Sequence, residues 1–475
     1  MHRSPLILLA VFAAAGPSPQ QTPPHGRSYF VAPAPVGTSA ADGSERNPWD
    51  LATALAGGAR SGMPMRVQPG DTIWLRGGTY RGAFRSTVAG REGAPVVVRQ
   101  FPGERAIIDG AGVGARRSTL YVVGDYSVFW GFELTNSDPQ RTSPTTGSDF
   151  RSNVVVPSAS HTKFINLVVH DGGVAFYTEP KYPDIEISGC IIYNNGWQGP
   201  DRGHGHALYI KNYTGPLVVR DNVMFNQYGW GVHAFTNANT GKLINITIEE
   251  NVAFNSGALG NRRTLASNIL LGGDAYAAGD VVRDNIAYYS PSLTGAGANV
   301  MIGWKTLRNG DVVVENNYLV GGSPVLEFGF WSAARVATNT VIATGAARGP
   351  RIVRRDPGAR GQIWRDNWER PAPTATKVVV RANRYEKGRA HVVVLNWGQA
   401  TAVAVDVGGV LVPGDRYDVH NVQDLFGAAV ASGTVVGSSI TIPLGGVKPP
   451  VPVGWSSSPA PQTGPAFDVF LITKR

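Results

Sequence analysis

A short pattern of apolar and polar residues recurs along the chain from about residue 120 to residue 342. Each copy has an apolar or β-branched pair, then a Gly or Asn, then further apolar residues. These pivot residues stand at positions 131, 166, 189, 222, 251, 285, 317 and 339. They lie about 22 to 35 residues apart, which predicts a solenoid whose bare coil takes roughly 20 to 25 residues, with the rest in loops.

The pivots and the segments between them narrow the kind of solenoid. No helical segments separate the apolar runs, which excludes a leucine-rich repeat and a barrel of alternating strands and helices. An Asn at a pivot can adopt the left-handed backbone conformation and stack its amide on neighbouring coils. The repeats therefore predict a solenoid of β-strands, and periodicity by itself also fits other β-repeats.

The first hundred residues predict a distinct start to the solenoid. Residues 47–56 read as a short helix, which Asn47 can cap and which has Pro48 at its first helical position. A Pro-Gly-Asp-Thr-Ile strand and a Gly-Gly-Thr-Tyr turn follow within residues 69–80. A Pro-Gly…Ile-Ile-Asp-Gly stretch lies within residues 96–110.

This opening resembles the N-terminal cap and first coil of the pectin-lyase-like superfamily, which includes polysaccharide lyases. The resemblance rests on the capped helix, the strand and turn that follow it, and the later Ile-Ile-Asp-Gly stretch. It implies an all-β fold, a right-handed parallel β-helix over residues 26–345 with an N-terminal capping helix. It says nothing of a particular activity.

Two further segments follow the repeats. The Arg-, Pro- and Gly-rich stretch at residues 346–376 is predicted to be a linker, or a strap packed on the solenoid. Alternation then resumes in about six runs, which predicts a small antiparallel β-sandwich over residues 377–475. This segment resembles the C-terminal sandwiches of many secreted carbohydrate-active enzymes. Carbohydrate binding and closure of the solenoid's open end are both possible roles, and we expect closure.

The N-terminal residues predict export. Residues 1–25 combine a basic start, an apolar run at residues 6–15, a small-residue cleavage site and a polar spacer, which together indicate a signal peptide. No other segment is long and apolar enough to span a membrane. Cys190 is the single cysteine, so no intramolecular disulfide can form, and its Ile neighbours indicate a small buried side chain. We expect a secreted or periplasmic monomer.

The net charge of +9 bears on the partner. A basic chain is a common sign of nucleic-acid binding, but no nucleic-acid motif is present and the arginines are scattered. For an exported protein an anionic polysaccharide is the better candidate partner.

The densest group of reactive side chains is the run 201–212, which holds an acid, an arginine, two histidines, a tyrosine and a lysine. An apolar alternation starts at Leu208, so Tyr209 and Lys211 face outward on one strand. His206 then lies at the edge of this strand. One coil later the chain has a run of the same shape, and setting Val232 beside Leu208 places His233 beside Tyr209, about 4.8 Å away.

Neighbouring coils extend this outward face into a groove. The preceding coil adds Tyr177 and Glu179, and the following ones add Asp274, Trp304 and Lys305. Aromatic rings that stack on sugars and titratable groups over a central ring suit a polymer lying along the solenoid. The candidate catalytic residues are His206, Lys211, His233 and Tyr209, and the candidate substrate-binding residues are Asp201, Arg202, His204, Trp197, Tyr177, Trp230, Asp274 and Trp304.

The side chains of this groove suit β-elimination on a uronic-acid polymer. A base, among His206, Lys211 and His233, removes the C5 proton, and Tyr209 as the acid protonates the leaving oxygen. Arg202, or a Ca²⁺ ion held by Asp201, neutralises the C5 carboxylate. Polysaccharide lyases of the resembled fold work in this way, although the chain has no clear cluster of acids for Ca²⁺ and no lyase motif that matches residue by residue.

Several alternatives stay open at this point. The Asp-x-x-His spacing of Asp201 and His204 is similar to that in alginate C5-epimerases of the same fold, which share the proton-abstraction step. Glycoside hydrolysis needs two carboxyl groups, and the candidates are Asp171, Glu179, Asp201 and Asp274, with no pair singled out by spacing. A non-catalytic polysaccharide-binding or adhesin-like solenoid is a third reading, because fold alone does not fix function. The His-x-His pair is a poor zinc signal without a third ligand.

Overall fold

The computed structural model describes residues 26–58, 65–147, 149–237, 239–260, 266–293, 297–344, 351–356, 361–455 and 461–475. The predicted signal peptide and spacer at residues 1–25 lie outside these described residues. No helix in the described ranges is long and apolar enough to span a bilayer.

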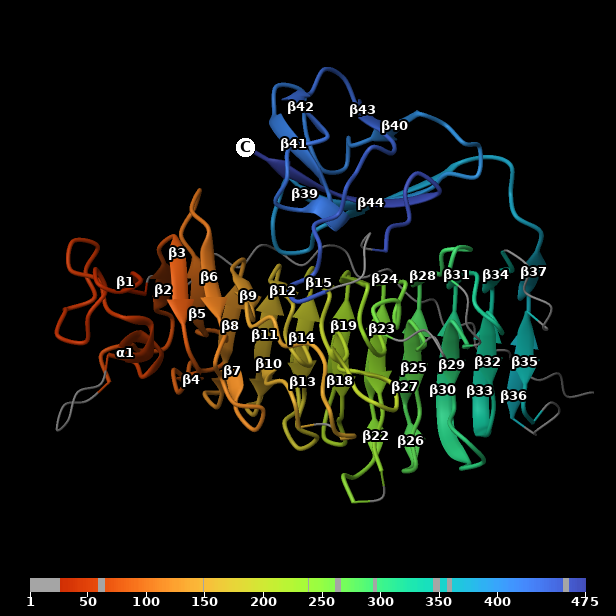
Figure 1. The fold of residues 1–475 in the computed structure, drawn as a ribbon, viewed down its shortest axis with the longest axis horizontal. Coiled ribbons are helices and arrows are strands. Elements are labelled where there is room, and N and C mark those ends of the chain that lie inside the picture. Colours follow the sequence, from red (N-terminus) through yellow and green to blue (C-terminus); the bar gives the residue numbers. More distant parts are fainter. Residues whose placement is uncertain are drawn as a thin grey trace, which may run out of the picture.

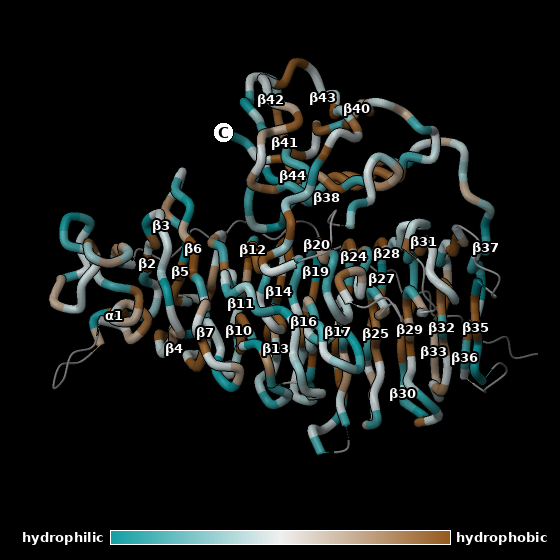
Figure 2. The backbone as a smooth tube through the Cα atoms, in the orientation of Figure 1, coloured by the Kyte–Doolittle hydropathy of each residue, from teal (hydrophilic) through white to brown (hydrophobic). Residues whose placement is uncertain are grey.

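Most of the described chain forms a parallel β-helix of three long sheets, which confirms the predicted fold class (Figure 1). Successive strands visit sheet 1, sheet 2 and sheet 3 in turn, and each strand pairs with its counterparts one coil away. Figure 2 shows apolar segments recurring from coil to coil. Val, Ile, Leu and Phe side chains that point inward from the three sheets build one continuous core, as the strand alternation predicts.

Each sheet is continuous along the solenoid. Sheet 1 contains β4 (Phe84–Ser86), β7 (Ser118–Val122), β10 (Asn153–Pro157), β13 (Phe176–Tyr177), β18 (Leu208–Ile210), β21 (Val232–Ala234), β25 (Ile269–Leu271), β29 (Val300–Ile302), β32 (Leu326–Phe328) and β35 (Ile352–Arg354). Sheet 2 contains β1 (Ser28–Val31), β2 (Thr72–Leu75), β5 (Val96–Gln100), β8 (Ser127–Trp130), β11 (Thr162–Ile165), β14 (Ile185–Ser188), β19 (Leu217–Arg220), β23 (Ile246–Glu249), β27 (Asp280–Arg283), β30 (Asn309–Glu315), β33 (Trp331–Ala337) and β36 (Gln362–Arg365). Sheet 3 contains β3 (Gly78–Arg81), β6 (Ala106–Asp109), β9 (Glu133–Thr135), β12 (Val168–His170), β15 (Ile191–Tyr193), β20 (Val223–Phe225), β24 (Val252–Phe254), β28 (Ile286–Tyr288), β31 (Tyr318–Val320), β34 (Thr340–Ile342) and β37 (Trp368–Arg370).

A ladder of asparagines closes the turn between sheets 2 and 3. The Asn285 amide donates to the Asn317 Oδ1 atom at 3.0 Å and to the Ile248 carbonyl at 2.9 Å. The same stacking links Asn222, Asn251, Asn285, Asn317, Asn339 and Asn367. The predicted stacking is confirmed, but in these coils the left-handed residue is the one before the Asn, such as Asp284 with φ of 56°. The buried amides are satisfied by one another, which makes this turn a rigid spine.

The N-terminal helix starts later than the sequence indicates. Helix α1 spans Leu51–Leu55, and its cap is Asp50, whose carboxylate accepts a hydrogen bond from the Thr53 amide at 2.8 Å. Asn47 and Pro48 lie before it, so their predicted roles at the helix start are wrong. The helix buries Leu51 and Leu55 in the solenoid core, as a capping element must.

The segment predicted to be a linker or strap contains a further coil. Strands β35, β36 and β37 pair in parallel with β32, β33 and β34, and so continue all three sheets. Much of this coil is exposed, and Ile363 is 50% exposed. At the end of the solenoid there is less core for a coil to cover, so fewer of its positions need to be apolar. The apolar alternation that predicts strands is therefore weak in this arginine-rich coil.

The C-terminal residues form the predicted β-sandwich. One sheet contains β38 (Lys377–Ala382), β39 (Arg389–Leu395), β44 (Phe467–Lys474), β41 (Arg416–Asn421) and β42 (Ala431–Thr434), and the other contains β40 (Ala402–Asp406) and β43 (Ser439–Pro443). A short 3-10 helix, Val422–Asp424, follows β41. Strand β42 is the one described strand here that the sequence pattern does not predict.

The sandwich lies on the flank of the solenoid and does not close its end, so the expected closing role is wrong (Figure 1). Outward side chains of sheet 3, among them Phe225, Phe254 and Tyr288, pack against Phe467 and Leu471 of the sandwich. The Tyr288 and Phe467 rings stack with centroids 4.3 Å apart. From β15 to β28, sheet 3 is therefore apolar on both faces, one toward the solenoid core and one toward the sandwich.

A buried charged network joins the solenoid to the C-terminal segment. The His170 Nε2 atom lies 3.0 Å from the Glu133 carboxylate, and its Nδ1 atom lies 2.8 Å from the Asp171 carboxylate. Asp171 also accepts hydrogen bonds from Arg141 at 2.9 Å and from the Val453 amide at 3.1 Å.

Cys190, buried in the solenoid core, contacts the Phe164 carbonyl and is the small buried side chain that the sequence indicates.

We expect the free energy of unfolding to fall at alkaline pH, because His170 loses its proton there. Burial opposes its charge, but the Asp171 and Glu133 carboxylates outweigh burial and raise the pKa of His170 from 6.5 to about 9. Because the folded pKa lies above the unfolded one, the stabilisation is complete below about pH 6.5 and is lost as the pH rises through about 9. Its size is up to about 3 kcal/mol. Urea unfolding between pH 6 and pH 10 measures it.

The matched variant for this experiment is His170→Gln, which cannot carry the charge. Its free energy of unfolding should be lower at pH 6 and should fall less on going to pH 10. Equal slopes for both proteins would show that His170 does not cause the loss.

Candidate active-site groove

The predicted register on the outer face of sheet 1 is confirmed. Leu208 pairs with Val232, and Tyr209 pairs with His233. In the preceding coil Tyr177 pairs with Tyr209. In β18 and β21 the flanking residues are buried, while Tyr209 and His233 are half-buried.

A β-hairpin brings the start of the 201–212 run over this face. Strand β16 (Trp197–Gln198) pairs with β17 (Gly203–His204) in antiparallel fashion, and the Gly199 amide donates to the Arg202 carbonyl at the tip. Gly205 has φ of 83°, and a Cβ atom there would lie 2.3 Å from the Gly196 Cα atom. Glycine is therefore required where the two ends of the hairpin meet, since other residues are strained and too large. The Pro-Asp pair at positions 200–201 is the sequence signal for this turn.

Two of the predicted binding residues form the body of the hairpin. The His204 Nε2 atom lies 2.9 Å from the Asp201 carboxylate, and the His204 ring stacks on Trp197 at 5.4 Å. Trp197 is only 2% exposed, so it supports His204 and offers no free face to a sugar. Asp201 keeps 41% of its side chain exposed at the rim.

His206 and His233 form the centre of the groove, with ring centroids 4.6 Å apart. The His206 Nδ1 atom accepts a hydrogen bond from the Trp230 amide at 3.2 Å, which leaves a proton for Nε2 in the neutral ring. Burial, with His233 and Arg202 nearby, holds the pKa of His206 well below its ordinary value. Burial, with Arg202 and Lys211 nearby, lowers the pKa of His233 to about 3. Both imidazoles are therefore neutral at physiological pH.

A tyrosine and a lysine stand beside these histidines. The Tyr209 ring lies 4.9 Å from His233, and burial, then Tyr177, raises the pKa of Tyr209 to about 12. Lys211 is 5% exposed, and its Nζ atom donates to the Tyr177 hydroxyl at 2.6 Å. The Lys211 ammonium also faces the Tyr177 and Tyr209 rings, at 4.6 and 4.8 Å. It forms no ion pair with any described carboxylate.

Arg202 provides an accessible cation above the histidines. Its guanidinium lies 5.2 Å from the Trp230 ring centroid and 3.8 Å from the Asp201 carboxylate, and 47% of its side chain is exposed. The Trp230 ring in turn stacks on His233 at 4.8 Å. An anion that enters the groove at this point would meet the arginine directly.

The far part of the predicted groove is connected to the centre by Phe235. The Phe235 ring lies 5.0 Å from His233 and 5.5 Å from Trp304. Asp274 forms an ion pair with Lys305 at 2.9 Å, and both side chains are largely exposed. The structure thus connects Trp304 to the histidines through the Phe235 ring, and it leaves Asp274 at the margin.

Each carboxylate considered for hydrolysis or calcium binding is engaged by another side chain. Asp171 is buried in the network with His170 and Arg141, so its role as a hydrolase candidate is wrong. Glu179 accepts a hydrogen bond from Ser158 at 2.7 Å. Among the described residues no group of three or more His, Cys, Asp and Glu side chains could hold a metal ion. Asp201, engaged with His204, is a single acid and does not fit Ca²⁺, which takes six to eight oxygen ligands.

Comparisons with known proteins find likenesses in structure only. No family model matches the sequence, and no curated protein matches it. Solved structures that are similar include a rhamnogalacturonan lyase, with 17% identity over 72% of this chain and 87% of that chain and a TM-score of 0.49. A lacto-N-biosidase from Eubacterium ramulus has 14% identity over 72% and 67%, with a TM-score of 0.45. An alginate lyase from Paenibacillus has 16% identity over 72% and 95%, with a TM-score of 0.41. The roles of the side chains therefore rest on this chain's own geometry.

Proposed function

We propose that this protein is a carbohydrate-active enzyme that cleaves an acidic polysaccharide by β-elimination in the groove on sheet 1. The observation that carries the proposal is the packed set of Tyr209, His206 and His233 beneath Arg202. It combines a protonated hydroxyl and two neutral imidazoles within ring-contact distance of one another, and a half-exposed cation on the adjoining Trp230 ring. These are the acid, the base and the carboxylate partner that the reaction requires.

Each group has one step in the proposed reaction. Arg202 pairs with the C5 carboxylate of a uronate and so stabilises the charge that develops when C5 loses its proton. The His233 lone pair removes that proton. The C5–H electrons form the C4–C5 double bond, the C4–O bond breaks, and the Tyr209 hydroxyl protonates the departing oxygen. No water is consumed, and the new chain end is an unsaturated uronate.

The remaining polar groups of the groove position these three. His206 is oriented by the Trp230 amide, so its Nε2–H is a hydrogen-bond donor to substrate and not a base. Lys211 is fixed by Tyr177 at the side of Tyr209. The arriving carboxylate offsets the positive charges of Arg202 and Lys211, which both lower the pKa of His233, and so makes that histidine a better base.

The test is incubation with alginate, pectate and glycosaminoglycans while the absorbance of the unsaturated uronate is followed. We expect absorbance with one of these substrates, a loss of about 10²- to 10⁴-fold in Tyr209→Phe, and no effect of EDTA. Tyr209→Phe keeps the ring and its packing, so the change reports the hydroxyl alone. New reducing ends without absorbance would overturn elimination in favour of hydrolysis.

The cell compartment and the oligomeric state belong to the same proposal. An enzyme for an extracellular polymer must be exported, and the N-terminal sequence pattern supports a secreted or periplasmic protein. We propose that it acts as a monomer.

A further inference from the structure

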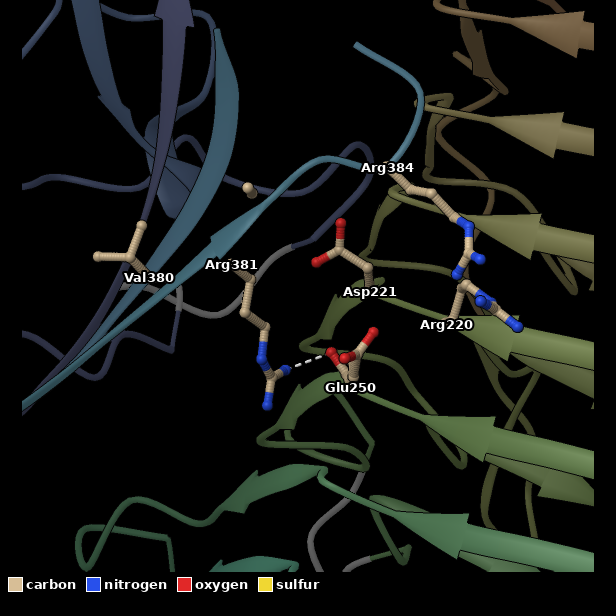
Figure 3. A pocket seen from close by; sticks show the side chains of 7 residues that line it. Arg220, Asp221, Glu250, Val380, Arg381 and Arg384 are labelled. Carbon is tan, nitrogen blue, oxygen red and sulfur yellow. Dashed lines mark hydrogen bonds between the residues drawn. The ribbon is translucent and has the colours of Figure 1, made fainter. Parts of the chain in front are cut away.

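A second cleft lies where the sandwich meets the solenoid, away from sheet 1. It has a volume of about 550 Å³ and runs along the turns that join sheets 2 and 3. A smaller pocket of about 250 Å³ adjoins it and shares Glu250 and Arg381. Figure 3 shows the smaller pocket, where Arg381 reaches from the sandwich to Glu250 on the solenoid.

The floor of this cleft is a row of side chains in register. Ile286 pairs with Tyr318, Tyr318 with Thr340, and Thr340 with Trp368, one residue from each of four successive coils. Trp368 is 41% exposed at the open end. An exposed indole and a half-buried phenol on one surface form a platform of the kind that stacks on sugar rings.

One wall of the cleft is a ladder of polar side chains. It consists of the left-handed turn residues Glu250, Asp284, Asn316 and Thr338, which precede the asparagines of the spine. The Glu250 and Asp284 carboxylates form no hydrogen bond or ion pair with other side chains of the described chain. They are therefore free to accept hydrogen bonds from a ligand's hydroxyl groups.

The other wall is strand β38, which presents alternate residues Lys377, Val379 and Arg381. The Arg381 guanidinium donates to the Glu250 carbonyl and, at 2.5 Å, to the Asp284 carbonyl, so it closes one end of the cleft. The Lys377 ammonium lies 5.4 Å from the Tyr318 ring. The negative charges of Glu250 and Asp284 equal the positive charges of Lys377 and Arg381. The cleft as a whole therefore favours neither an anionic nor a cationic ligand.

We propose that this cleft binds a single chain of a neutral oligosaccharide. Successive coils repeat about every 4.8 Å, which is close to the advance of one pyranose ring along an extended chain. On three coils a ring finds both a floor residue and a rung of the polar ladder: Ile286 with Asp284, Tyr318 with Asn316, and Thr340 with Thr338. The site holds roughly four rings, from Trp368 to the arginine that closes the cleft. The proposal does not rest on elimination in the sheet 1 groove.

The experiment is titration calorimetry of the full chain with cellohexaose and mannohexaose. We expect one of them to bind, and Trp368→Ala to weaken that binding about tenfold through loss of stacking. Asn316→Gly removes one rung at a position whose φ of 56° suits glycine, and it should weaken binding several-fold. Ile363→Ala, an exposed apolar residue on the same coil, and Lys211→Ala in the sheet 1 groove should both retain full affinity.

Three results would overturn the proposal. The first is no binding of either neutral hexamer at millimolar concentration. The second is unchanged affinity in both Trp368→Ala and Asn316→Gly. The third is binding of a mannuronate hexamer that Trp368→Ala abolishes, because this would show that the cleft takes acidic chains. Thermal unfolding of each variant separates loss of binding from loss of fold, and Asn316→Gly keeps the test valid if Trp368→Ala is destabilised.

Discussion

Replacement of His233 by alanine is expected to lower kcat by about 10²- to 10⁴-fold on the polysaccharide that the enzyme cleaves. The imidazole is neutral at working pH because its pKa lies at about 3, and its ring contacts Tyr209 on one side and Trp230 on the other. No described side chain stands in the same place to take over proton removal. Initial rates of absorbance at saturating substrate measure the loss.

The matched control is His161→Ala. His161 lies on a turn, where it stacks on Tyr126 at 4.3 Å and contacts Asp184 at 2.7 Å, outside the groove. Its kcat should remain that of the unchanged protein. If His233→Ala were fully active while Tyr209→Phe was not, another group would remove the proton and the assignment of the base would be wrong.

Replacement of Arg141 by alanine is expected to cost about 3 to 5 kcal/mol of unfolding free energy. The side chain is 3% exposed, and it donates to the Asp171 carboxylate and to the backbone carbonyls of Gly196, Asn194 and Val453. Without it the buried carboxylate loses a cation, and three carbonyls lose a donor. Urea unfolding followed by tryptophan fluorescence gives the difference.

Arg116→Ala is the control for this change, since it removes an arginine whose ion pair with Asp149, at 3.6 Å, is exposed to solvent. Such pairs contribute about 0 to 1 kcal/mol. If both variants lost a similar amount of unfolding free energy, burial of the Arg141 network would not be the reason for its contribution to stability. The Arg141 change should also lower turnover, because Asn194 and Gly196 lead directly into the hairpin that carries Arg202.

The centre of the groove could be predicted because it depends on short-range alternation. A period of two places Leu208 and Val232 inward, and stacking of equal coils then fixes Tyr209 beside His233. The hairpin was not predicted, since it depends on antiparallel pairing inside a loop. This pairing buries Trp197 against His204, which no periodic pattern reveals.

The sequence contains a sign that another segment covers the outer face of sheet 3. Runs such as Val223–Phe225 and Val252–Phe254 are apolar at every position, and all their residues are buried. A strand that is apolar on both faces is covered on both faces. Which segment covers it depends on contacts between residues far apart in the chain, such as Asp221 with His391, 170 residues away, at 3.1 Å, and a local pattern cannot show these.

The hairpin between Gly196 and Gly205 leaves and re-enters the solenoid at nearly the same point, because the backbones of these two glycines touch. An insertion with adjacent ends can change in length or composition without altering the coils on either side. Arg202 and Asp201, at the rim of the groove, belong to that insertion, whereas Tyr209 and His233 belong to the coils. If the proposed elimination holds, substrate preference and bond cleavage are encoded in separable parts of the chain, and exchange of the hairpin alone would change the substrate without disturbing the coils.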